Sequence, residues 1–353
     1  MKRMVIGVVL AGLALGTARA DQGRSAKTPQ YQKVAAITIG GDGGWDFLTV
    51  EPTTKRLYAP HANFVAVIDL EKDAVVGRVD DTPGAHGFLA IPALDRGFSS
   101  NGSENTSTMV ELSTLRVIKK IRTGENPDAM LYDPAREEVY TFNADRAGTA
   151  YSATVIAART GNVVATIPMP GKPELAALDP AAGRIYSAIQ DKNVVVAIDT
   201  ATHAIVANWP TAPGAEATGL AIDTKSHRLF VGCGNGKLIL MDSRNGAVLD
   251  TAPTGTGNDG VEFDAATGLI FSAETEGTLT ILQVASDGRL KVVQTLRTPW
   301  RSKTMALDPV THKIYVASGL YQPLPPSKPG EATPKPIPVS GSFTVLVFGP
   351  ASR

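Results

Sequence analysis

Short apolar runs alternate with polar turns along the chain from about residue 33 onward. The runs are rich in Val, Ile and Leu, and they are bounded by Gly, Pro, Asn and Asp. This pattern predicts short β-strands joined by tight turns. After residue 20, no stretch shows the 3.6-residue period of an amphipathic helix.

These strands belong to a repeating unit, marked by an acidic turn that precedes an apolar and aromatic strand. Clear copies are LDPAAGRIYSA from Leu178 and LDPVTHKIYVA from Leu307. Strands such as VAVIDL (Val65 to Leu70) and VVATIP (Val163 to Pro168) follow the landmark, which gives four strands per unit. The successive landmarks lie 41, 41, 46, 44, 41 and 44 residues apart, at Glu51, Pro92, Asp133, Asp179, Asp223, Asp264 and Asp308.

Seven units of this length with four strands each predict an all-β, seven-bladed β-propeller spanning residues 21–353 as one domain. The last unit lacks its fourth strand, whereas an orphan strand, KVAAITI, occupies residues 33–39. We expect residues 33–39 to pair with residues 343–348, so that the N-terminal strand closes the ring and removes an exposed edge. Residues 320–340 form a Pro-rich insertion in the seventh blade, interpreted as a solvated loop, with a lid or a partner-binding arm as the alternative.

The N-terminus resembles a cleaved targeting segment. Lys2 and Arg3 precede an apolar stretch from Met4 to Leu15, and Ala18-Arg19-Ala20 matches a small-x-small cleavage site. We therefore expect residues 1–20 to be a signal peptide and the mature protein to be periplasmic. No later apolar run reaches the length of a transmembrane segment. Cys233 is the only cysteine, expected to be a buried apolar residue, with a reactive thiol as the alternative.

Charge and composition narrow the range of partners. Formal net charge is zero and aromatic residues make up 6% of the chain, so binding to nucleic acid is disfavoured. The aspartates at the repeated turns, such as Asp133 and Asp308, are expected to cap backbone amides. The chain contains no motif typical of a nucleophilic hydrolase, a phosphate-binding loop or a zinc protease. We expect a monomer that binds a small molecule or a protein.

The loops entering the inner strands differ from unit to unit, which is typical of functional loops. Their polar residues should meet in one axial funnel: Trp45, Asp46, His86, Asp128, Glu174, Glu216, Asn258, Asp259, Arg301 and Lys303. Companion loops add Asn101, Asp145, Asp191, Asn235, Glu274 and Glu276. This carboxylate-rich set with one histidine favours a cation, an amine or a polyhydroxylated ligand, although capping of strand ends would also explain individual residues. No cofactor is evident; His86, Asp128, Glu174 and Asp259 are the candidate ligands for a divalent metal.

The motifs PGAHGF, ENPDAM and GKPELA, together with the strand pattern, resemble the YVTN-repeat propellers, and in particular an exported bacterial subgroup of the YncE-like family. In that subgroup, His86-Gly87, Asn126-Pro127-Asp128, Lys172-Pro173-Glu174 and Thr304-Met305 stand at matching places. The sequence departs from the family form at Gln190-Asp191 and Glu276-Gly277, which weakens the expectation of a metal there.

Three functions remain open after these observations. The first is a non-catalytic binding or scaffold propeller, favoured because catalytic motifs are absent from the sequence. The second is a metal-assisted lactonase or lyase that uses the funnel histidine and carboxylates, a possibility that rests on analogy of fold. The third is binding of single-stranded DNA, which the resemblance to YncE-like proteins implies and the zero net charge disfavours.

Overall fold

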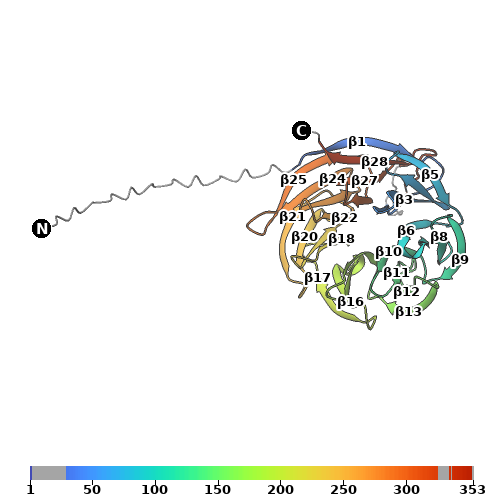
Figure 1. The fold of residues 1–353 in the computed structure, drawn as a ribbon, viewed down its shortest axis with the longest axis horizontal. Coiled ribbons are helices and arrows are strands. Elements are labelled where there is room, and N and C mark those ends of the chain that lie inside the picture. Colours follow the sequence, from blue (N-terminus) through green and yellow to red (C-terminus); the bar gives the residue numbers. More distant parts are fainter. Residues whose placement is uncertain (2–28, 325–333, 335, 352–353) are drawn as a thin grey trace.

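The computed structural model describes residues 1, 29–324, 334 and 336–351. Seven four-stranded antiparallel sheets stand around a central axis, so the fold is a seven-bladed β-propeller (Figure 1). The predicted signal peptide lies outside the described residues, except for Met1, as does much of the Pro-rich insertion. Within the described part of the chain, no helix is long and apolar enough to cross a membrane.

From the axis outward, the first three blades contain β2 (Thr49–Glu51), β3 (Arg56–His61), β4 (Phe64–Asp69) and β5 (Ala74–Val79); β6 (Ala85–Ile91), β7 (Arg96–Asn101), β8 (Thr106–Glu111) and β9 (Arg116–Arg122); and β10 (Pro127–Asp133), β11 (Glu138–Asn143), β12 (Ser152–Ala157) and β13 (Asn162–Pro168). The next three contain β14 (Pro173–Asp179), β15 (Arg184–Ile189), β16 (Val194–Asp199) and β17 (Ile205–Pro210); β18 (Ala217–Asp223), β19 (Arg228–Cys233), β20 (Lys237–Asp242) and β21 (Val248–Pro253); and β22 (Asn258–Asp264), β23 (Leu269–Glu274), β24 (Thr278–Val284) and β25 (Leu290–Arg297). The seventh contains β26 (Met305–Asp308), β27 (Lys313–Ser318), β28 (Thr344–Pro350) and β1 (Tyr31–Thr38).

The repeat read from the sequence matches the blades, with one shift of register in blade two. Glu51 pairs with Arg56 in blade one, and Ile91 pairs with Arg96 in the same place. The counterpart of the acidic landmark is therefore Ile91, not Pro92. Pro92 instead begins a short 3-10 turn, Pro92–Leu94, that replaces the turn capped by an aspartate or, in blade one, by Glu51.

The aspartates at the ends of the inner strands cap the following turns, as predicted. Asp133 accepts a hydrogen bond from the Ala135 amide at 2.9 Å, and Asp308 accepts one from the Val310 amide at 2.9 Å. Each bond satisfies a backbone donor that the turn would otherwise leave unpaired. These carboxylates stabilise the turns, so they are not candidate ligands for a metal ion.

The core lies between the blades. In one cluster, Tyr140 and Phe142 of blade three pack against Ile185 and Val196 of blade four. Each sheet therefore buries both faces against its neighbours, which is why no blade needs a helix to cover it. Cys233 is buried in one of these clusters, and burial raises the pKa of its thiol to about 12, as expected for a buried apolar cysteine.

The N-terminal strand closes the ring as predicted. β1 runs antiparallel to β28, with Ala36 opposite Leu346, and the two strands lie side by side in Figure 1. Tyr31 fastens the start of β1: its hydroxyl donates to the His312 carbonyl at 2.8 Å. The Gln294 side chain of blade six bonds both the amide and the carbonyl of Tyr31 at 2.8 Å. Closure therefore joins the first strand to two different blades.

Every outer strand carries an irregularity in its pairing. The register shifts at the third-to-fourth strand pairing in all seven blades, for example between Val67 and Ile68 in blade one and between Lys33 and Ala35 in blade seven. Such bulges increase the local twist of an edge strand. They make the rim of the propeller a poor template for pairing with another chain.

Replacing Tyr31 with Ala should test the closure. Tyr31 is 2% exposed, so we expect its loss to lower the free energy of unfolding by about 3 kcal/mol or more, because a buried aromatic ring and a hydrogen bond disappear. Val34→Ala on the same strand is the control: Val34 is 47% exposed, and we expect a change below about 0.5 kcal/mol. Urea titration measures both, and equal effects would contradict a stabilising role for Tyr31.

Candidate functional site

One residue of each blade enters the mouth of the central channel at an equivalent place. In blade two, Ala85 pairs with Asn101 and Gly87 pairs with Ser100, so His86 falls in a register shift between them. The same shift occurs in blades three, four, five and six. A bulge re-aims a side chain that would otherwise alternate with the strand. The equivalent residues, called here the funnel ring, are Asp46, His86, Asp128, Glu174, Thr218, Asp259 and Lys303.

Six of the residues predicted for the funnel belong to the funnel ring, and four lie elsewhere. Trp45 stacks on Phe343 with ring centroids 4.9 Å apart. Asn258 is buried between blades, where its side chain accepts from the Gly219 amide and donates to the Ser272 hydroxyl. Glu216 is exposed on the entry loop of blade five. Arg301 has its guanidinium over the rings of Trp300 and Tyr321.

Blade five shows why the sequence placed one residue wrongly. Glu216 was the polar residue of its entry loop, but the register shift falls between Ala217 and Gly219. Thr218 therefore occupies the ring position, and the Gln190 side chain donates to its hydroxyl at 3.2 Å. A search for charged residues in the loop misses a threonine. Aligning the repeats by the residue of the second strand that pairs with the start of the inner strand, Cys233 in this blade, would have identified Thr218.

Three members of the funnel ring form a tight cluster, Asp46, His86 and Asp128. His86 Nδ1 lies 2.8 Å from Asp46 Oδ2 and 3.5 Å from Asp128 Oδ1. One ligand atom from each residue lies within 4.8 Å of the others, a spacing that could hold a metal ion. Blades one, two and three each contribute one of them, from equivalent places at the start of adjacent inner strands.

The charges of this cluster support one another. Burial disfavours an imidazolium, but the charge of Asp128 and the hydrogen bond to Asp46 outweigh it and raise the pKa of His86 to about 9. Burial also opposes ionisation of Asp46, yet the hydrogen bond to His86 and the charge of Lys303 leave the pKa of Asp46 below its usual value. For Asp128, burial dominates and raises the pKa. At neutral pH the cluster is an imidazolium held between two carboxyl groups.

Both carboxyl groups keep an oxygen without a hydrogen bond. Asp46 Oδ1 and Asp128 Oδ1 are buried and have no hydrogen-bond partner among the described residues, and the same holds for Asn126 Oδ1 beside them. The distance of 3.5 Å from His86 to Asp128 is too long for a good hydrogen bond. Leaving a buried acceptor unpaired is costly. Three such acceptors around one histidine indicate a place for a donor or a cation.

A glycine makes room for the histidine. A Cβ atom at Gly102 would lie 2.6 Å from both His86 Nε2 and Asn126 Oδ1. That approach is closer than a real side chain allows, so glycine leaves the space that the imidazole occupies. Gly102 and Asn126 were not among the predicted site residues: Gly102 meets His86 through the pairing within blade two, and Asn126 through the packing of blade three against blade two.

Lysines neutralise the other two carboxylates of the funnel ring. Lys172 Nζ lies 2.5 Å from Glu174 Oε1 and 2.9 Å from Gln190 Oε1. Burial raises the pKa of Glu174 to about 7, and the charge of Asp128 acts in the same direction. Lys303 forms an ion pair with Asp259. The candidate metal ligands Glu174 and Asp259 are therefore paired with lysines, and Asp46, which was not on that list, joins His86 and Asp128 instead.

A pocket of about 260 Å³ opens beside Asp46. Its walls include Trp45, Arg301, Lys303 and Tyr321, and the Pro-rich segment contributes Pro336 and Pro338. Trp45 and Tyr321 lie with ring centroids 5.5 Å apart. The pocket therefore joins an aromatic wall to the carboxylate end of the cluster.

The residues of the companion loops stabilise their own loops or bind them to the entry loops. Asp145 accepts from the amides of Ala147, Thr149 and Ala150. Asn101 bonds the hydroxyls of Thr106 and Thr108. Glu274 accepts from the Thr278 hydroxyl, whereas Asp191, Asn235 and Glu276 accept from backbone amides of the entry loops of their own blades. These side chains support the funnel rather than face it.

Comparison with solved structures supports the fold. The chain is similar to one from hydrazine synthase of Kuenenia stuttgartiensis, with a TM-score of 0.67 and 14% identity over 78% of this chain and 93% of that one. It is also similar to a chain of the mitotic checkpoint complex, with a TM-score of 0.70 and 13% identity over 99% and 98%. No family model and no curated protein matches the chain. At such identities the likeness shows the propeller fold alone, so membership of the YncE-like family stays a prediction.

Titration of His86 should test the charges of the cluster. The pKa of about 9 lies above the ordinary value of 6.5, so the ion pairs should contribute stability that is complete below pH 6.5 and is lost as the pH rises through 9. We expect NMR of the imidazole nitrogens to show a protonated ring at neutral pH. Asp46→Asn should lower this pKa by more than one unit, about the effect of losing an adjacent charge.

Glu276→Gln serves as the control for that titration, because Glu276 bonds Thr256 away from His86. We expect it to leave the His86 titration unchanged. A His86 ring that loses its proton near the ordinary value in the unmodified protein would contradict the proposed charge state.

Proposed function

We propose that this protein is a non-catalytic, periplasmic binding propeller whose funnel ring binds a divalent metal ion together with a small polar ligand. The observation that supports this most strongly is the pair of buried, unpaired oxygens, Asp46 Oδ1 and Asp128 Oδ1, beside His86. Buried acceptors of this kind call for a donor or a cation.

The chemistry of the donors suits a transition metal. One imidazole nitrogen and two carboxylate oxygens are ligands that Zn²⁺ and Mn²⁺ accept. Four carboxyl groups (Asp46, Asp128, Glu174 and Asp259) face two lysines (Lys172 and Lys303), which leaves a formal charge of −4 + 2 = −2 when His86 is neutral. A divalent ion would neutralise that charge and take the place of the His86 proton.

The neighbouring pocket provides the place for a second component. Three protein ligands leave coordination positions open on a metal. The pocket of about 260 Å³ begins at Asp46 and ends at an aromatic wall with Arg301. A small ligand with a carboxylate or hydroxyl group would fit between the open metal positions and the Arg301 guanidinium. Single-stranded DNA is a poorer occupant, because the unpaired atoms of the cluster are acceptors, not phosphate-binding donors.

Titration with Zn²⁺ should test the proposal. At neutral pH one proton must leave His86 when the ion binds, so the affinity should rise about tenfold per pH unit below its pKa. We expect Asp128→Asn to weaken binding by about tenfold or more, in line with loss of a ligand. Isothermal titration calorimetry in buffers of different ionisation enthalpy would measure both the affinity and the released proton.

Glu216→Gln is the matched control, since Glu216 lies on the entry loop of blade five but outside the funnel ring. It removes one acidic charge and should leave the affinity unchanged. Absence of Zn²⁺ binding, or equal losses in both variants, would overturn a metal site at Asp46, His86 and Asp128.

A metal-assisted hydrolase or lyase is the second candidate, favoured by Glu174. Its pKa of about 7 would let the carboxyl group donate or accept a proton at neutral pH. Zn²⁺-loaded protein should then open a lactone substrate, and Glu174→Gln should lower the rate by about a hundredfold while metal binding persists. No turnover across a panel of lactones would leave the binding function as the better account.

A further inference from the structure

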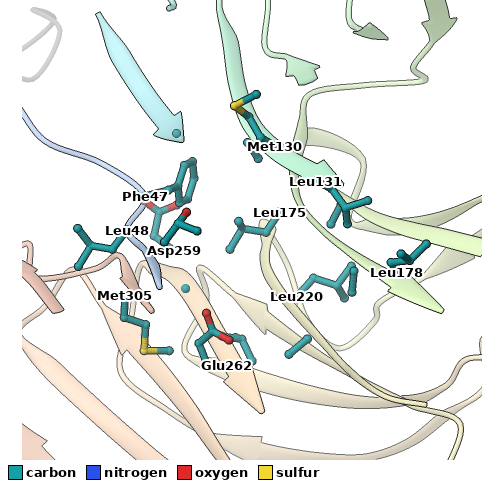
Figure 2. Close-up of a pocket in the computed structure, with 18 of the residues that line it drawn as sticks. Phe47, Leu48, Met130, Leu131, Leu175, Leu178, Leu220, Asp259, Glu262 and Met305 are labelled. Atoms are coloured by element: carbon teal, nitrogen blue, oxygen red, sulfur yellow. The ribbon is translucent and has the colours of Figure 1, made fainter. Parts of the chain in front are cut away.

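A second space lies next to the funnel ring and shares Asp259 with it. It is a cavity of about 350 Å³ along the axis, lined by residues of the inner strands of all seven blades. Figure 2 shows residues that line it, among them Leu48, Leu175, Leu220 and Met305, which come from four different blades. Two carboxyl groups, Asp259 and Glu262, are labelled among these apolar side chains. The volume falls in the range of cavities that bind small molecules.

Glu262 departs from the repeat at its level. In each blade one inner-strand residue pairs with an aromatic residue of the second strand, as Glu262 does with Phe271. The other six blades have no charged residue there: they have Thr49, Leu89, Leu131, Ala177, Ala221 and Ala306. The fold therefore forms at this level without a carboxyl group, and Glu262 serves no structural need that the other blades share.

Few groups stabilise a charge on Glu262. Its one neighbouring donor is the backbone amide of Leu307 on β26, and burial raises the pKa of its carboxyl group to about 7. Asp259, which lines the same cavity, is already paired with Lys303. On the adjacent inner strands, Asp223 and Asp308 cap turns. Within the described residues, no cation faces Glu262.

We propose that this axial cavity is a binding site for an alkylammonium group, with Glu262 as its counter-ion and the leucine and methionine side chains around its hydrocarbon part. An ammonium ion supplies the donors and the charge that an ionised Glu262 lacks in its apolar surroundings. The hydrocarbon part would bury apolar surface against the walls. This site shares Asp259 with the funnel ring, but Glu262 lies outside that ring, and the proposal does not rest on the metal proposed there.

Binding of hexylammonium chloride to the purified protein tests the proposal, with 1-hexanol as the neutral probe. We expect hexylammonium to bind with at least about tenfold higher affinity than hexanol at a pH above 7, where Glu262 is ionised. Below that pH the affinity for hexylammonium should fall about tenfold per unit, because the ammonium must displace a proton from the carboxyl group. The affinity for hexanol should not change with pH.

Glu262→Gln keeps the shape of the side chain and removes its charge. We expect it to weaken hexylammonium at least about tenfold and to leave hexanol unaffected. Glu276→Gln, in the same blade but outside the cavity, is the matched control and should bind like the unmodified protein. Ala221→Leu, which fills part of the cavity, should weaken both probes.

The outcomes separate this site from the funnel. Zn²⁺ binding should persist in Glu262→Gln, since Glu262 is not among the clustered ligands. Failure to bind Zn²⁺ would leave the alkylammonium site standing, whereas equal hexylammonium affinity in Glu262→Gln and the unmodified protein would overturn it. Absence of hexylammonium binding at millimolar concentration would indicate a channel that holds only water.

Discussion

Closure of the ring by the pairing of β1 with β28 is the constraint on which the rest of the structure depends. A four-stranded sheet with two apolar faces is unstable alone, and each blade is covered only by its neighbours. The ring therefore needs its last interface as much as its first. Tyr31 and Gln294 secure that interface by joining the N-terminal strand to blades seven and six. Once the circle is closed, the inner strands converge on one axis.

The same irregularity of β pairing serves two purposes at different radii. At the rim, bulges in the outer strands disturb edges that could pair with other chains. At the mouth of the channel, register shifts turn His86, Asp128, Glu174 and Asp259 toward the axis. A regular strand would direct neighbouring side chains to alternate faces of the blade. The chemistry of the funnel thus depends on where the ladder is interrupted.

Charges along the axis are arranged unevenly. In blades one to three, an imidazolium lies between two carboxyl groups that keep unpaired oxygens. In blades four, six and seven, the carboxylates Glu174 and Asp259 are paired with lysines. Glu262 lies in the adjoining cavity, where, within the described residues, no cation faces its carboxyl group. The axis therefore offers chemically different places, although it is built from one repeated unit.

The sequence by itself determined the number of blades, the four strands of each unit, the closing strand and the capped turns, because these follow from local periodicity and turn chemistry. It also singled out most of the funnel ring, since the entry loops are the variable part of each repeat. It did not list Thr218, Gly102, Asn126 or Lys172 among the site residues, although the last two belong to motifs it singled out. It included Glu216, Asn258, Trp45 and Arg301, which lie outside the funnel ring. Only the tertiary structure decided these places, because a register shift of one residue changes the direction of a side chain and the packing of adjacent blades sets which groups meet. Glu262 shows the same limit. That no cation lies near its carboxyl group depends on how the seven inner strands are placed around the axis.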